Sequence, residues 1–285
     1  MKMKKLLAIV AACMLVAAFG LFGCGQQQAA EEPAPAEDQA APAEDQAAAA
    51  VDYTLLNEGK LTVATSPDFP PFENLDGSEY IGLDMDIMRA VSEKLGLEFN
   101  PVSIQFDGIV PAIVAGGQAD CAISGITITP DRAEQVDFTL PYYTDDLAIV
   151  VMNGSTITEE NVDTALNDAA VTIAVQSGTT GADYAKENFS SATFSEYGNA
   201  NDTFAALQAD KAQALVTNKA VAESMLASYT DAVIVKNIAT GEEYGIAVSK
   251  DNPGLTAAIN AALAELEADG TLEVLTAQWM SAAVE

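Results

Sequence analysis

The chain has 285 residues and is strongly acidic, with 42 Asp and Glu against 12 Lys and Arg, no His, and a formal net charge of −30 at pH 7. Such a charge repels phosphate backbones and anionic lipid headgroups, which excludes nucleic acid as a direct partner. Histidine and paired-cysteine spacings are both missing from the sequence, so the usual zinc-site patterns are excluded and we expect neither a metal nor a cofactor.

The first segment has the order of an export signal. Lysines within the first five residues precede an apolar run, Leu6–Phe22, that ends in Leu21-Phe22-Gly23-Cys24. We predict a signal peptide over residues 1–23. Its end resembles a bacterial lipobox, which implies that Cys24 is lipidated and holds an exported protein at the outer face of the cytoplasmic membrane, or in the periplasm if the cell has two membranes. A signal retained as an anchor would also leave the protein facing outward.

Residues 24–51 have the composition of a tether. Pro35-Ala36-Glu37-Asp38-Gln39-Ala40 recurs as Pro42-Ala43-Glu44-Asp45-Gln46-Ala47, and residues 26–50 hold acids but no bases, aromatic or branched apolar residues. Such a segment cannot bury enough apolar surface to fold. We predict a disordered acidic tether rich in Ala, Pro, Glu and Gln, which places the work of the protein close to a membrane.

The remaining body, from residue 52 onward, alternates short apolar runs with helical patterns. The expected strands are Leu61–Thr65, Glu98–Ser103, Cys121–Ser124, Ala148–Met152, Thr172–Val175, Thr193–Tyr197, Ala214–Thr217, Ala232–Val235 and Tyr244–Ser249. The expected helices are Asp84–Leu95, Phe106–Ala115, Thr179–Glu187, Asn201–Ala209, Lys219–Ser228, Pro253–Asp269 and Leu272–Met280. This alternation predicts a mainly parallel α/β sheet, with helices on both faces and ligands beyond the carboxyl ends of the strands.

The segment Ser124–Arg132 is the most informative part of the body. It joins a strand end to a helix start with Pro130 in the first turn, and it carries a rare base, Arg132. A guanidinium beside exposed backbone N–H groups suits a carboxylate. The alternative is a surface ion pair of Arg132 with a neighbouring acid. Other polar residues also fall at strand ends and favour a binding cleft: Ser66, Thr127, Thr180 and Asn218.

Gly82-Leu83-Asp84-Met85-Asp86-Ile87, followed by Val91, resembles the signature of the bacterial extracellular solute-binding proteins for polar amino acids (family 3), the receptors of ABC importers. Ser92 departs from that pattern, which has a small apolar residue there. Asp84 and Asp86 lie in a helix's first turn and are expected to be structural. Further segments resemble the family in its order, over residues 58–280: Pro70–Glu73, Phe106–Pro111, Ser124–Arg132, Val136–Phe138, Gln176–Thr180 and Tyr244–Val248.

The resemblance implies a two-lobed α/β fold of the periplasmic-binding-protein-like type II, acting as a monomer, with two hinge strands. Lobe 1 would comprise residues 52–145 plus 246–285, and lobe 2 residues 146–245. The crossings would lie near Tyr143–Asp146 and Glu242–Gly245. We expect the acid pairs Asp145-Asp146 and Glu242-Glu243 to be solvated hinge charges.

The resemblance also implies how a ligand carboxylate is held. Arg132 matches the family's carboxylate-binding arginine, with help from the side chain and N–H of Thr127. Thr180 would offer its N–H to the same carboxylate from the start of a helix in lobe 2. One carboxylate held from both lobes would make binding favour closure. The alternatives are a plain helix cap for Thr180 and a local hydrogen bond for Thr127.

Phe69 and Phe106 match positions where family members place aromatic rings around the ligand's carbon chain, and the alternative is that they are ordinary core residues. Asn218 stands where many members carry an aspartate that accepts the ligand's ammonium, together with the Gly125 carbonyl. Loss of that charge leaves three interpretations: weaker binding of an amino acid, an ammonium held by another acid such as Asp68, or a carboxylate without an α-amino group. A solvent-facing turn residue is the structural alternative for Asn218.

Ser66 stands where receptors for cationic amino acids often carry aspartate, and Ser66 and Gln176 would line the side-chain end of the site. The resemblance therefore implies a binding protein, not an enzyme, that delivers a small carboxylated solute, expected to be a neutral polar amino acid, to an ABC permease. The alternatives are a dehydratase-like enzyme on the same scaffold, with Glu73 or Asp68 as acid or base, and a sensory binding protein.

Overall fold

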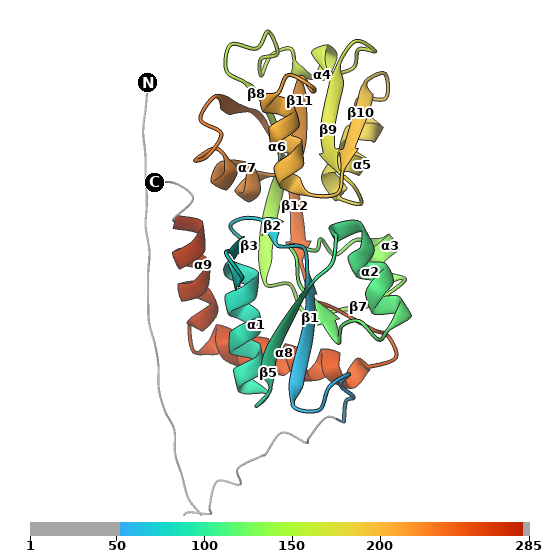
Figure 1. The fold of residues 1–285 in the computed structure, drawn as a ribbon, viewed down its shortest axis with the longest axis vertical. Helices are drawn as coiled ribbons and strands as arrows, with labels where there is room; N and C mark the ends of the chain where they lie inside the picture. Colours follow the sequence, from blue (N-terminus) through green and yellow to red (C-terminus); the bar gives the residue numbers. More distant parts are fainter. Residues whose placement is uncertain (1–51, 282–285) are drawn as a thin grey trace, which may run out of the picture. The chain divides into compact units, whose positions relative to one another are not determined.

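Two five-stranded sheets, each flanked by helices, carry the fold of residues 52–281, which are the residues that the computed structural model describes (Figure 1). We call the sheet β5-β1-β6-β13-β7 with its helices the first lobe, and the sheet β10-β9-β11-β8-β12 with its helices the second lobe. The expected signal peptide, Cys24 and tether lie outside the described residues. Within residues 52–281, no helix has the length and apolar character needed to cross a membrane.

The first lobe is built from both ends of the described chain. Its sheet strands are β1 (Lys60–Thr65), β5 (Glu98–Ser103), β6 (Cys121–Ala122), β7 (Asp137–Phe138) and β13 (Ala247–Val248). Its helices are α1 (Leu83–Lys94), α2 (Phe106–Ala115), α3 (Pro130–Ala133), α8 (Pro253–Ala268) and α9 (Thr271–Ser281). A separate small sheet joins β2 (Asp68–Phe69), β3 (Glu73–Asp76) and β4 (Glu79–Ile81).

The second lobe occupies the middle of the chain. Its strands are β8 (Tyr143–Met152), β9 (Thr172–Gln176), β10 (Thr193–Tyr197), β11 (Ala214–Asn218) and β12 (Ala232–Tyr244). Its helices are α4 (Val162–Ala165), α5 (Thr180–Asn188), α6 (Ala200–Gln208) and α7 (Lys219–Met225). The sequence boundaries of the two lobes, 52–145 plus 246–285 and 146–245, stay a prediction.

The inner strands β1 and β8 are buried on both faces, because their apolar side chains follow one another and point in turn to opposite faces of the sheet. In β1, Leu61 and Val63 join one core cluster with residues of α1 and α8, whereas Ala64 joins a second cluster with residues of α2. In β8, the same alternation sends Val150 and Ile149 to different clusters. A continuous apolar run is what a strand buried on both faces requires.

The sheets are mixed, which corrects the expectation of a mainly parallel sheet. β1 pairs in parallel with β5 and β6, and β9 with β10 and β11. β13 and the long pair β8 and β12 are antiparallel to their neighbours. The sequence predicted residues 232–235 of β12 and, as the start of another strand, its last residue Tyr244, because the residues between are largely polar and lack an apolar run.

Three acids are buried near the hinge strands. Asp84, in the first turn of α1 as predicted, is fully buried and accepts hydrogen bonds from the Gly125 N–H at 2.8 Å and the Tyr142 hydroxyl at 2.9 Å. Burial raises its pKa to about 6. Glu73 is also fully buried, beside Asp84, and desolvation raises its pKa well above the ordinary value. We infer that this carboxyl pair shares a proton, since two close carboxylates cannot both ionise in a dry core.

Asp145 corrects the expectation of a solvated hinge charge. It is buried, it accepts a hydrogen bond from the Tyr244 hydroxyl at 3.1 Å, and burial raises its pKa to about 6. Its backbone segment is the start of β8, which pairs with the end of β12 at Tyr143 and Tyr244. The hinge therefore holds this acid buried beside the Tyr244 ring, and Phe72 packs against the rings of Tyr143 and Tyr244.

These raised pKa values make stability depend on pH. Because Asp84 and Asp145 bind protons more tightly when folded than when unfolded, their contribution is full below pH 4 and is lost as pH rises through 6. We expect the free energy of unfolding, measured by urea titration, to be higher at pH 5 than at pH 7.5 by about 1–3 kcal/mol. Asp145→Asn should reduce that difference, and a protein less stable at pH 5 than at pH 7.5 would contradict it.

The geometry of Gly82 explains why the signature begins with glycine. Its φ of 127° is in the region that favours glycine, and an added Cβ would lie 2.1 Å from the Phe72 carbonyl oxygen. We expect Gly82→Ala to destabilise the fold by about 3 kcal/mol or more in denaturant titration. Gly77→Ala is the matched control, because Gly77 also has a positive φ, 62°, but has open space around its Cβ position. Its cost should be only about 1–2 kcal/mol, and equal losses for the two variants would refute the steric argument.

Candidate functional site

One carboxylate oxygen collects donors from both lobes. The Oε2 atom of Glu242 accepts hydrogen bonds from the Asn218 amide at 2.8 Å, the Thr180 hydroxyl at 3.0 Å and the Thr127 hydroxyl at 3.2 Å. Thr127 follows β6 of the first lobe, whereas Thr180 opens α5 and Asn218 ends β11 of the second. The structure thus brings together three residues that the sequence predicted for one site, around an acid that it expected to be solvated.

The structural alternatives for these residues are wrong. Asn218 is buried at 4 % exposure and does not face solvent. The cap of α5 is Thr179, whose hydroxyl accepts from the Ala182 N–H at 3.1 Å, so Thr180 is free to donate its own proton elsewhere. The hydroxyl of Thr127 is bonded to a residue far along the chain and has no local partner of this kind.

The shape of β12 explains why Glu242 points into the site. The pairing of β12 with β8 is irregular between Ile238 and Glu242, and the carboxylate of Asp146 accepts hydrogen bonds from the N–H groups of Thr240 and Gly241 at 2.9 and 3.0 Å. Beyond this bulge the strand alternates, so Glu242 shares a face with the fully buried Tyr244 while Glu243 is exposed.

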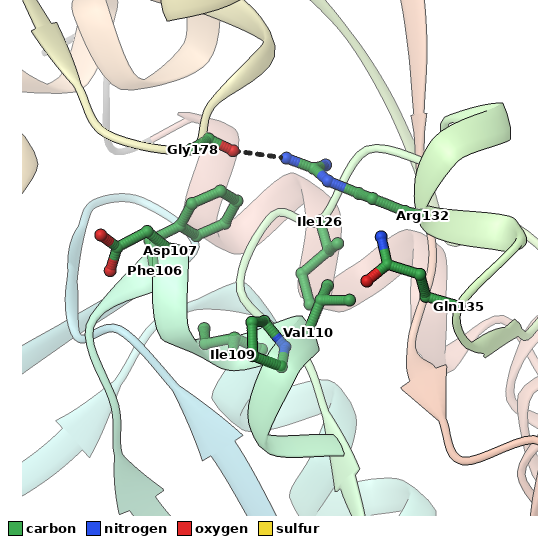
Figure 2. A pocket seen from close by; sticks show the side chains of 9 residues that line it. Phe106, Asp107, Ile109, Val110, Ile126, Arg132, Gln135 and Gly178 are labelled. Carbon is green, nitrogen blue, oxygen red and sulfur yellow. Dashed lines mark hydrogen bonds between the residues drawn. The ribbon is translucent and has the colours of Figure 1, made fainter. Parts of the chain in front are cut away.

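Arg132 joins the two lobes through backbone carbonyls. Its guanidinium donates to the Thr127 carbonyl at 2.8 Å and to the Gly178 carbonyl of the second lobe at 2.9 Å, and it lies 5.4 Å from the centroid of the Phe106 ring (Figure 2). Burial lowers its pKa, and the nearby charges of Glu242 and Asp183 oppose that shift. Among the ion pairs of residues 52–281 none involves Arg132, so the surface pairing considered from the sequence is not formed.

A cavity of about 230 Å³ flanks this guanidinium (Figure 2). Of the predicted site residues it includes Arg132 and Phe106 but neither Thr180 nor Asn218. Its apolar walls come from α2 and from the loop after β6, and the Gln135 side chain also lines it. The lining is Phe106, Asp107, Ile109, Val110, Pro111, Ile126, Arg132, Gln135 and Gly178.

Phe69 and Gly125 lie against one another on the first lobe. A Cβ built on Gly125 would be 3.1 Å from the Phe69 ring, and the Gly125 N–H is held by Asp84 at 2.8 Å. Phe69 is buried and stacks on Phe72 with ring centroids 6.1 Å apart. The buried acid Asp84 therefore supports, from behind, the backbone of the loop that carries Gly125 and Thr127.

Ser66 and Gln176 are both buried, but neither side chain is hydrogen-bonded to Glu242 or Arg132 within the described residues. The Ser66 hydroxyl donates to Asp68 at 2.8 Å. The other oxygen of Asp68 accepts from the Ala200 N–H at 2.7 Å, at the start of α6 in the second lobe. Burial raises the pKa of Asp68, and its hydrogen bonds oppose that rise.

The arrangement can bind and orient a charged group. Among residues 52–281, no group of three or more His, Cys, Asp or Glu side chains is placed to hold a metal ion. The residue that sequence reasoning missed is Glu242. Its alternation with Tyr244 and the Gly241 before it were the signals that could have identified an inward-facing acid.

Comparison with known proteins identifies the family. The family model described as bacterial extracellular solute-binding proteins, family 3, matches residues 61–282. The arginine-binding extracellular protein ArtP of Bacillus subtilis is 30% identical over 98% of this chain and 99% of its own length. An ancestral arginine-binding protein bound to glutamine superposes with a TM-score of 0.73, at 34% identity over 78% of this chain and 98% of that one.

The ancestral amino acid-binding protein AncCDT-1, described as a precursor of cyclohexadienyl dehydratase, superposes with a TM-score of 0.70, at 34% identity over 78% of this chain and 95% of that one. Its description is that of a binding protein, as is that of ArtP. The matched segment covers both lobes and every candidate site residue from Ser66 to Glu242. The relatives are described as binding proteins and not as enzymes, and the chain belongs to the bacterial extracellular solute-binding proteins, family 3.

Proposed function

We propose that this chain captures one small amino acid between its two lobes and delivers it to the permease of an ABC importer. The observation that carries the proposal is the convergence of Thr127, Thr180 and Asn218, from both lobes, on a single carboxylate oxygen. Donors arranged in this way form a receptor for a carboxylate, and a carboxylate that both lobes bind favours their closure. The relatives described as amino acid-binding proteins support the same function.

Arg132 would supply the charge of this receptor. Two of its five N–H donors are used on carbonyls, which leaves others for a ligand carboxylate. The Phe106 ring beneath the guanidinium and the Phe69 ring against Gly125 would enclose the ligand's carbon chain and exclude water. The Gly125 carbonyl and the carbonyl oxygen of Asn218 would accept from the ligand's ammonium group.

We propose a neutral polar amino acid as the ligand. Ser66 and Gln176 are buried polar side chains without charge, and Asp68, the acid that Ser66 contacts, already has both oxygens hydrogen-bonded. A cationic amino acid is the second candidate, because ArtP is described as arginine-binding and because Glu242 adds a negative charge to the site. A ligand panel that contains glutamine, serine, arginine and lysine separates the two candidates.

Arg132 gives the sharpest test. In calorimetric titration of the full chain, purified in detergent, Arg132→Ala should weaken binding of the amino acid by about 2–5 kcal/mol, because the ligand carboxylate loses its charged partner. Arg132→Lys should recover only part of that loss, since lysine cannot donate in a fork. Arg89→Ala is the matched control, because Arg89 is paired with Asp86 on α1, contacts none of the candidate site residues, and should leave affinity unchanged when replaced. Wild-type affinity in Arg132→Ala would rule out the proposed site.

We also propose that the protein acts as a monomer held at the outer face of the cytoplasmic membrane by a lipid on Cys24. Cells grown with radiolabelled palmitate should label the wild-type chain and should not label Cys24→Ser. Cys13→Ser is the matched control and should keep its label, because the apolar run before Cys13 is too short for a signal. A labelled Cys24→Ser variant would contradict this attachment.

A further inference from the structure

Glu242 uses the donors on which the proposed ligand site depends. A threonine hydroxyl has one proton to donate, and Thr127 and Thr180 both donate theirs to the Oε2 atom of Glu242. Asn218 donates a third hydrogen bond to the same atom at 2.8 Å. A ligand carboxylate can receive the two hydroxyl protons only if Glu242 gives them up.

We propose that the Glu242 carboxylate is a built-in occupant of the carboxylate subsite, and that an incoming amino acid displaces it. The inference rests on the proposed function and deepens it, because it names the group with which the ligand competes. Glu242 presents to the three donors the same chemical group that the ligand would present. Displacement leaves Glu242 tethered to β12, next to the site and able to return.

The hinge is built to keep Glu242 available. The bulge that Asp146 holds directs the Glu242 side chain inward. Glu242 lies on the hinge strand β12, where it pairs with Asp145 of the other hinge strand, β8. Glu242 is only half-buried, which leaves solvent into which its side chain can turn. A tethered group of this kind competes at a high effective concentration without being consumed.

Asn218 fits this role better than aspartate would. The amide lies 2.8 Å from Glu242 and donates to it, whereas an aspartate at this position would place two carboxylates in contact. Asn218, which replaces the aspartate that the resemblance implies here, and the inward-facing Glu242 are therefore two parts of one arrangement. The cost of the competition is a lower apparent affinity, since only the fraction of molecules with Glu242 displaced can bind the ligand carboxylate.

The first test needs no knowledge of the ligand. The full chain and its Glu242→Ala and Glu243→Ala variants are purified in detergent and refolded from guanidinium to remove co-purified solute. Acetate supplies a free carboxylate, with chloride at equal ionic strength as the reference. We expect 100 mM acetate to raise the thermal midpoint of Glu242→Ala by about 3 °C, since acetate then takes the place of the missing side chain. The wild type and Glu243→Ala, whose changed residue is exposed, should not respond.

The second test uses the amino acid found with the ligand panel. Glu242→Ala should bind it about tenfold more tightly than the wild type, because the competitor is gone, and Glu243→Ala should bind it like the wild type. Weaker or unchanged binding by Glu242→Ala would overturn the proposal, and weaker binding would show that Glu242 contacts the ligand instead. Should Glu242→Ala not fold, Glu242→Gln takes its place, because glutamine keeps an acceptor but loses the charge. Glu242→Gln should also bind the amino acid more tightly than the wild type, and weaker or unchanged binding would overturn the proposal.

The two tests keep the two proposals apart. If no amino acid binds to any variant, the proposed function fails, and the acetate response alone decides the role of Glu242. If the wild type binds an amino acid but Glu242→Ala gains neither affinity nor an acetate response, the function stands and the role proposed for Glu242 is wrong.

Discussion

A charged group held from both lobes is the interaction on which the rest of this structure depends. The oxygen of Glu242 is bound by Thr127 of the first lobe and by Thr180 and Asn218 of the second. Two further contacts repeat the principle, since Arg132 donates to the Gly178 carbonyl and Asp68 accepts from the Ala200 N–H across the same boundary. Each of these bonds has a charged partner, which makes it stronger than a bond between neutral groups.

The first lobe supports these contacts with buried acids. Asp84 holds the Gly125 N–H from behind, and Glu73 lies beside it in a surrounding without solvent. An acid in such a place is costly when charged, which is why the pKa values of both groups are raised. The loop with Gly125 and Thr127 is thus held by hydrogen bonds from the Gly125 N–H to Asp84 and from the Ser124 hydroxyl to Glu73.

Much of the fold could be predicted from the sequence, because most helices and inner strands have strong apolar periodicity. Phe106–Ala115 and Thr193–Tyr197 were predicted with their observed bounds. The long strand β12 was missed between Val235 and Tyr244, since its polar residues there lack such periodicity. The separation into two lobes came from resemblance alone, because no local pattern records which distant strands share a sheet.

The candidate site was predictable in part. Thr127, Thr180 and Asn218 were predicted as one group because they lie at the ends of strands and the starts of helices. Arg132 was predicted because it is one of few bases and lies between a strand end and a helix start. Glu242 was expected to be solvated, because its inward direction depends on a bulge that Asp146 holds from another strand. The contact with Asp146 cannot be read from the sequence, and the local signals for an inward-facing acid were the Gly241 before Glu242 and the alternation of Glu242 with Tyr244.

The measurement that tests the central claim most directly is a crystal structure of the chain with its amino acid bound. The account predicts that the ligand carboxylate accepts the hydroxyl protons of Thr127 and Thr180 beside the Arg132 guanidinium, and that the Glu242 side chain has turned away from them. A complex in which Glu242 keeps all three of its hydrogen bonds while the ligand carboxylate lies elsewhere would contradict it.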